Sequence, residues 1–217
     1  DLDSATSVLA PAVAANASAT VASEYDQVYQ GKLSAWLKYA NSLKLRMAIR
    51  MRFVEPEKAK EIGEQAVKDG VMTSNDDNLT INYIPNGLYK TSVEWGDTRA
   101  CADIETYMNG YHDPRIEKYF SAAATQGDRK IIGMRAAANV GNKTTADALY
   151  SAANVGQSDR GVWMTAAEVT FCRAEGALAG WSGMGGTVGE LYNEAVKLSF
   201  EQWGVTGADE YLNNDTY

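Results

Sequence analysis

The sequence predicts a mainly α-helical fold of stacked antiparallel helix pairs, with long irregular loops and little β structure. Apolar residues recur at steps of three and four along residues 33–70 and 165–204. Each stretch is divided near its middle by residues typical of a turn. Small residues on the apolar stripes let neighbouring helices approach closely. These features favour an α-solenoid, although no internal repeat of roughly 34 residues is present.

Length, composition and charge narrow the class of protein. The 217 residues, 45% of them apolar, are enough for one large globular domain. A net charge of −8 disfavours binding to nucleic acid or to anionic lipid. The sequence contains neither a run of about 20 apolar residues nor a visible signal peptide. It opens abruptly, so we expect a single domain, 1–217, that is a fragment of a longer protein.

The first helix pair is expected over residues 33–70. The preceding segment, 1–32, is rich in Ala, Ser and Val and has weak periodicity, so we expect it to be irregular, as a loop or a fraying helix. Pro56 suits the first turn of the second helix, and Gly70 suits a left-handed cap at its end. Their positions predict two helices joined by a short turn at residues 54–56.

The second helix pair is expected over residues 165–204. Two capping boxes, Thr165 with Glu168 and Thr187 with Glu190, predict where its two helices start. Gly204 is a plausible stop signal.

Residues 79–162, between the two pairs, predict a loop-rich, ligand-facing region. It begins with alternating residues 79–84, which indicate at most a short strand. Helical stretches are expected at 99–109 and after Asp113-Pro114, whereas 121–162 is rich in small and polar residues and is expected to be irregular.

The sequence contains no convincing catalytic or metal-binding pattern. His112 is the only histidine and no nucleophile elbow accompanies it. Carboxylates suited to glycoside hydrolysis occur without a recognisable context. Cys172 lies in a helical apolar pattern typical of a buried thiol, and a disulfide with Cys101 is left open. We therefore expect no catalytic residue, no metal site and no cofactor.

Aromatic and polar residues mix between Tyr83 and Tyr111, and this composition suits sugar binding. Sugar rings stack their apolar C–H faces on aromatic rings, while their hydroxyl groups need fixed polar partners. The candidate ligand-binding residues are Trp95, Tyr89, Asp97 and Arg99. The alternative is that the rings only fasten the loop to the helices.

Three segments also resemble one known family. Residues 36–50 read W-L-K-Y-A-N-S-L-K-L-R-M-A-I-R and resemble the W-x-K-F-A-N-S-L-R-L-R-L-A-M-R segment of SusD/RagB-like proteins. Residues 113–120 resemble D-P-R-x-x-x-Y-F, and residues 166–176 resemble the helix A-E-V-x-F-L-x-A-E-A of the same family. With smaller matches, the resemblance covers roughly residues 26–204 in the family's order.

The resemblance implies tetratricopeptide-like helix pairs and a role without catalysis in the Bacteroidetes. Such a protein binds an oligosaccharide, or another nutrient such as a peptide, and passes it to a SusC-like TonB-dependent transporter. It is a surface lipoprotein of the outer membrane, held only by an N-terminal lipid anchor that this chain lacks. Two alternatives remain open: a helical protein-interaction scaffold without its own small-molecule site, and a glycan-cleaving enzyme.

Overall fold

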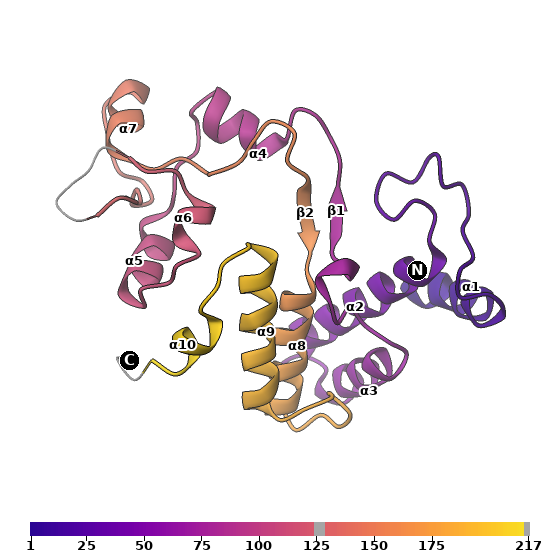
Figure 1. Ribbon diagram of the computed structural model, residues 1–217. Coiled ribbons are helices and arrows are strands. Elements are labelled where there is room, and N and C mark those ends of the chain that lie inside the picture. The colour runs from indigo at the N-terminus through magenta and orange to yellow at the C-terminus, as the bar shows by residue number, and fades with distance from the viewer. Residues whose placement is uncertain (124–128, 215–217) are drawn as a thin grey trace. The chain divides into compact units, whose positions relative to one another are not determined.

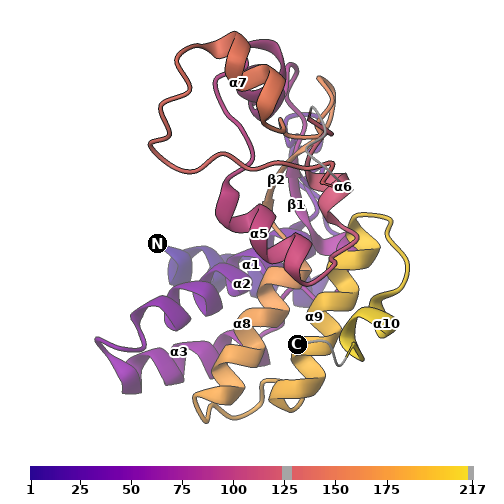
Figure 2. The same ribbon diagram turned by 90° about the vertical axis from the view of Figure 1, so that its left-hand side faces the viewer.

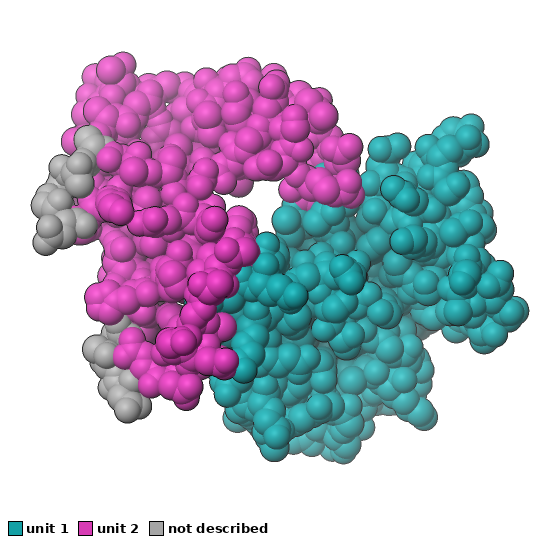
Figure 3. All heavy atoms as spheres, in the orientation of Figure 1, with its two compact units in different colours: residues 1–81, 162–202 teal, residues 82–161, 203–217 magenta. Residues whose placement is uncertain are grey.

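The computed structural model describes residues 1–123 and 129–214 and divides the chain into two compact units (Figure 3). Unit 1 contains residues 1–81 and 162–202, and unit 2 contains residues 82–161 and 203–217. Residues 82–161 make most of their contacts among themselves, and in the sequence they lie between the two segments of unit 1. The chain, which we expected to be a single domain, therefore contains two compact units.

Unit 1 contains both predicted helix pairs (Figure 1). The first is α2 (Leu33–Met51) with α3 (Pro56–Lys68), and the second is α8 (Ala166–Leu178) with α9 (Val188–Gln202). Two ion pairs join α2 to α8, Arg46 with Glu168 at 3.2 Å and Arg52 with Glu175 at 2.6 Å. The later residue of α2 pairs with the later residue of α8, so α2 and α8, the first helices of the two hairpins, run parallel. The prediction of stacked helix pairs is confirmed.

A tryptophan joins the two pairs. Trp181 lies in the turn between α8 and α9 and is buried. A Cβ atom on Gly63 of α3 would lie 2.2 Å from the Trp181 ring, and one on Gly176 of α8 would lie 2.9 Å from it. Both glycines therefore leave the space that the indole ring fills, and the ring packs against a helix of each pair.

Two buried polar residues of α2 fix the end of α3. Asn41 Nδ2 donates hydrogen bonds to the carbonyl oxygens of Asp69 and Gly70, at 3.2 and 3.0 Å. The Ser42 hydroxyl accepts a hydrogen bond from the backbone N–H of Met72 at 2.9 Å. Gly70 has φ +98°, so the predicted left-handed cap is confirmed. These side chains satisfy backbone groups that the end of a helix leaves without partners.

The start of the chain differs from the expected irregular segment. Residues 2–15 form α1 (Leu2–Ala15), and only the remainder of 1–32 lacks a helix. Lys44 of α2 forms an ion pair with Asp3 at 2.7 Å and donates a hydrogen bond to the Thr6 hydroxyl at 2.7 Å. An alanine-rich sequence favours a helix. Contacts with α2 stabilise this helix further, and the weak periodicity of the segment does not predict them.

A two-stranded sheet stands where the chain leaves and re-enters unit 1. It pairs β1 (Leu79–Ile81), which follows the 3₁₀ turn η1 (Asn75–Asp77), with β2 (Gly161–Met164). β1 confirms the short strand expected at 79–84. The ends of the intervening segment are therefore neighbours in space, as Figures 1 and 2 show.

Unit 2 consists of short helices with a small core of its own. The helices are α4 (Gly87–Tyr89), the π-helical turn η2 (Lys90–Glu94), α5 (Ala102–Gly110), α6 (Ile116–Tyr119), α7 (Lys143–Leu149) and α10 (Ala208–Leu212). Met108, Ile116 and Ile131 form the core.

The region between the pairs is thus less irregular than expected. Helix α7 lies inside the stretch 121–162, where the Asn142 side chain caps it by accepting a hydrogen bond from Thr145 N–H at 2.9 Å. Residues 124–128 of that stretch lie outside the described residues. Within 1–123 and 129–214, no helix combines the length and the apolar character needed to cross a membrane.

Candidate functional site

The candidate ligand-binding residues lie in a loop of unit 2 over residues 86–99. Asn86 starts it: its Oδ1 accepts hydrogen bonds from the N–H groups of Leu88 and Tyr89, and its Nδ2 donates to the Asp159 carbonyl at 2.9 Å. The buried Asn86 therefore fixes the start of α4 and ties it to the returning chain.

A π-helical turn places the tryptophan. The N–H of Trp95 donates to the carbonyl of Lys90 at 2.8 Å, which is the wider spacing of a π-helix. Such turns are rare and occur often at functional sites. Gly96 then takes φ +65°, a left-handed conformation that ends the turn.

Helix α7 clamps the loop through two residues one turn apart. Lys143 forms an ion pair with Asp97 at 2.7 Å and also donates a hydrogen bond to the Trp95 carbonyl. Asp147 forms an ion pair with Arg99. A Cβ on residue 96 would come within 3.1 Å of both members of that second pair, so glycine is the residue that fits. The clamp holds the chain at Trp95 and at the residues that follow it.

The four candidate residues occupy different environments in this loop. The Trp95 side chain is 49% exposed, and Lys90 Nζ lies 5.5 Å from the centre of its ring. Asp97 is exposed and paired with Lys143. Arg99 has a side chain only 5% exposed, so it faces the protein interior, and Tyr89 is half-buried on α4. Trp95 and Asp97 therefore lie at the surface, whereas Arg99 is buried and joins the loop to α7 through Asp147.

Sequence reasoning missed Lys90, Lys143 and Asp147. Lys90 presents its ammonium to the face of Trp95, a cation–π arrangement. The other two belong to α7, in a stretch expected to be irregular. The signal that could have found them is the Asn142 cap followed by charged residues four apart, which share one helix face.

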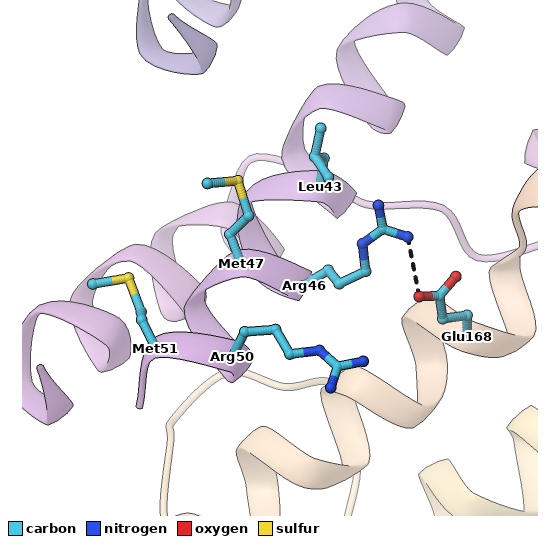
Figure 4. Close-up of a pocket in the computed structure, with 6 residues that line it drawn as sticks. All are labelled: Leu43, Arg46, Met47, Arg50, Met51 and Glu168. Carbon is cyan, nitrogen blue, oxygen red and sulfur yellow. Dashed lines mark hydrogen bonds and ion pairs between the residues drawn. The ribbon is translucent and has the colours of Figure 1, made fainter. Parts of the chain in front are cut away.

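Unit 1 contains a second concave feature, an open groove of about 470 Å³ between α2 and α8 (Figure 4). It is lined by Leu43, Arg46, Met47, Arg50, Met51 and Glu168. Arg46 is paired with Glu168, whereas Arg50 makes no ion pair with any residue that the structure describes. Met47 is 54% exposed, so this apolar side chain of α2 faces the groove and not the core.

The helices run antiparallel within each pair, the first helices of the two pairs run parallel, and Trp181 contacts both pairs; these features define unit 1 as a tetratricopeptide-like helical array. The model of the SusD-like family, described as SusD and RagB outer-membrane lipoproteins, matches residues 1–217. The chain therefore belongs to the SusD-like family.

Solved structures agree with this assignment. A SusD-like protein from Bacteroides thetaiotaomicron is 39% identical, with TM-score 0.92, over 99% of this chain and 45% of that one. A SusD homologue from the same organism is 41% identical, with TM-score 0.85, over 90% and 42%. A chitin-binding SusD homologue from Flavobacterium johnsoniae is 39% identical, with TM-score 0.90, over 99% and 45%.

The chain thus spans less than half the length of these structures. No curated protein is similar enough to count as a match.

Proposed function

We propose that this chain contributes to non-catalytic binding of a glycan, and that the 86–99 loop makes the contact. The observation that carries the proposal is the fixed, half-exposed ring of Trp95 beside Asp97 and Lys90. An aromatic face can stack on the C–H face of a sugar, while Lys90, whose ammonium lies over one face of the ring, and Asp97 in the same loop can exchange hydrogen bonds with hydroxyl groups. The clamp from α7 keeps the ring in place before the ligand arrives, which lowers the entropy cost of binding.

The similarity to solved structures supports a glycan as the ligand, since the Flavobacterium johnsoniae homologue is described as chitin-binding. A peptide nutrient is the second ligand class. We further propose that the whole protein is a lipid-anchored protein of the outer-membrane surface that delivers its ligand to a SusC-like TonB-dependent transporter. The description of the family as outer-membrane lipoproteins supports the location.

Pairing of the nearby carboxylates supports binding without turnover. Asp97 and Asp147 are both engaged in ion pairs, with Lys143 and Arg99. Glycoside cleavage requires two carboxyl groups that flank the scissile bond, whereas each of these carboxylates is held by a cation of the protein itself. Incubation with labelled oligosaccharides tests this point: release of shorter sugars, abolished by Asp97→Asn, would establish an enzyme.

Isothermal titration with N-acetylglucosamine and glucose oligosaccharides and with a peptide panel tests the binding proposal. We expect Trp95→Ala to weaken glycan binding roughly fivefold, because the stacking contribution of an aromatic ring is of the order of 1 kcal/mol. Phe53→Ala is the matched control, since Phe53 is an exposed aromatic residue of unit 1 outside the loop. A folded wild-type chain that binds neither sugars nor peptides contradicts the proposal.

One observation favours the alternative of a protein-interaction scaffold. Phe53, Val54 and Leu178 are highly exposed at helix ends of unit 1, and exposed apolar groups are typical of contact surfaces. If the scaffold reading is right, the paired change Trp95→Ala with Tyr89→Ala leaves nutrient uptake and the transporter complex unchanged. Under the same reading, Phe53→Asp and Leu178→Asp disrupt the complex.

A further inference from the structure

Helix α2 is positively charged, although the chain as a whole is acidic with a net charge of −8. The helix contains no acidic residue, and its cations are Lys38, Lys44, Arg46 and Arg50. The two lysines each form an ion pair at 2.7 Å with an acidic side chain outside the helix. The two arginines line the groove between α2 and α8. The groove therefore collects the positive charge of α2 that the lysines leave over.

The acidic residues of α8 do not neutralise this charge completely. Glu168 pairs with Arg46 at 3.2 Å, and Glu175 pairs with Arg52 at 2.6 Å. Helix α8 contains no further acidic residue, and within 1–123 and 129–214 no acidic side chain pairs with the exposed Arg50. A guanidinium group offers five N–H donors in a planar fork that matches a carboxylate. Arg50 therefore keeps its donors for a carboxylate that the described residues do not supply.

Apolar side chains line the same groove. Leu43, Met47 and Met51 follow one another at steps of four along α2. Leu43 and Met51 are half-buried against the core, whereas Met47 is 54% exposed. Figure 4 shows that Arg46 and Arg50 extend toward α8, while Met47 and Met51 extend to the other side of α2. The groove therefore has a cationic row and an apolar row, both with the repeat of a helix.

A helix is the segment whose side chains match this repeat. Rows of side chains at steps of four on one helix pack between such rows on another. Methionine adapts its shape to different apolar surfaces, so Met47 and Met51 suit an incoming helix. Arg46 can share its donors with a second carboxylate, because its pair with Glu168 is partly exposed on both sides and such pairs are weak. Charge complementarity therefore favours an acidic helix over a neutral or basic one.

We propose that the groove between α2 and α8 binds an acidic amphipathic helix of a partner protein. The apolar row of that helix covers Met47 and Met51, and a row of glutamate or aspartate side chains beside it pairs with Arg50 and Arg46. The inference goes beyond glycan binding and does not depend on it, since the groove belongs to unit 1 and the Trp95 loop to unit 2. The residues that line the groove include no aromatic ring on which a sugar could stack.

The experiment measures fluorescence anisotropy of a labelled synthetic helix of about 18 residues, in which a leucine row and a glutamate row run side by side at steps of four. Two matched peptides replace every glutamate by glutamine or by lysine. Four forms of the chain are compared: the wild type, Arg50→Ala, Arg50→Glu and, as the matched control, Lys68→Ala. Lys68 is an exposed lysine of α3 that does not line the groove. Because the substituted residues lie on the surface, all four forms should melt at the same temperature; Arg50→Gln replaces Arg50→Ala if that variant melts lower.

We expect the wild type to bind the glutamate peptide more tightly than the glutamine peptide, and the lysine peptide most weakly. Arg50→Ala should bind the glutamate peptide about fivefold more weakly, and Lys68→Ala should bind it like the wild type. Arg50→Glu should lose more, and it should gain affinity for the lysine peptide, because the charge in the groove is reversed. A gain of this kind cannot arise from a variant that has only lost its fold.

Three results overturn the proposal. The first is a wild type that does not bind the glutamate peptide, or that binds it no better than Arg50→Glu does. The second is self-association of the chain in sedimentation velocity that Arg50→Glu abolishes, since the occupant is then a second copy of the chain. The third is citrate bound as tightly as the glutamate peptide, since the groove is then a site for small anions.

Discussion

The carboxylate of Asp26 organises the turn before the first helix pair. It accepts hydrogen bonds from the N–H groups of Val28, Tyr29 and Gly31, at 2.9, 3.2 and 2.7 Å, and from the Trp36 indole at 2.7 Å. Burial alone would raise the pKa of Asp26, but these donors outweigh it and hold the pKa below its ordinary value. The ionised form is therefore part of the fold.

Asp26→Asn should destabilise the chain by about 1–3 kcal/mol at pH 7, because the amide offers one acceptor oxygen instead of two. A lowered pKa contributes stability above the unfolded value, about pH 4, which is lost as the pH falls through the folded value. The difference between wild type and variant should accordingly shrink below about pH 4. Urea unfolding at pH 7 and pH 3 measures both, with the exposed Asp76→Asn as control.

The two thiols should differ in reactivity. Burial raises the pKa of Cys172 to about 11, so its reactive thiolate form is scarce, whereas Cys101 is exposed. We expect alkylation of the native chain at pH 8 to modify Cys101 first, and Cys172 only on unfolding. Mass spectrometry of the labelled peptides checks the order; equal rates in native protein would contradict the burial of Cys172.

Single residues show where sequence reasoning about the loop reaches its limit. An aromatic residue in a polar loop is visible in sequence, and Trp95 does present its ring to solvent. The burial of Arg99 is not visible, because it depends on Asp147, a residue 48 positions further along the chain whose helix was not predicted. The ligand-binding role of all four candidates stays a prediction.

At the scale of helices, Gly63 and Gly176 decide how closely the two pairs approach Trp181. Gly63→Ala should destabilise unit 1 by about 1–3 kcal/mol, since the added methyl group would lie 2.2 Å from the indole ring. Thermal unfolding followed by circular dichroism measures this loss.

Gly189→Ala serves as the matched control because no atom lies near its Cβ position in α9. It should leave stability unchanged or raise it by less than about 1 kcal/mol, as glycine is a poor helix former. A similar loss of stability in both variants would contradict the close packing of Gly63 against Trp181.

Helices with local start and stop signals were predictable, and helices that depend on distant partners were not. Thr187 and Glu190 satisfy each other's backbone N–H groups, at 2.8 and 3.3 Å, as their spacing predicts. Helix α1 has no buried residue and lacks a clear stripe, because its partner is the lysine of another helix. The π-turn before Trp95 requires a register of hydrogen bonds that periodicity does not encode.

At the scale of the whole molecule, unit 1 is discontinuous in sequence. Replacing residues 82–161 by a short glycine-rich turn should leave it folded, because β1 and β2 are already paired at the point of the cut. We expect a cooperative thermal transition and the helical circular dichroism of α2, α3, α8 and α9.

The comparison variant carries the same turn and, in addition, lacks the part of α8 that contains the buried residues Val169 and Cys172. That chain should lose cooperative unfolding. If the first deletion also melts without a transition, unit 1 requires unit 2 for its stability.

The pairing of β1 with β2 makes residues 82–161 an exchangeable cassette. Its two ends stand side by side, so length and composition can change between them while the helices before and after keep their register. A segment held in this way can be replaced by one of another length or composition without moving the two strands that flank it.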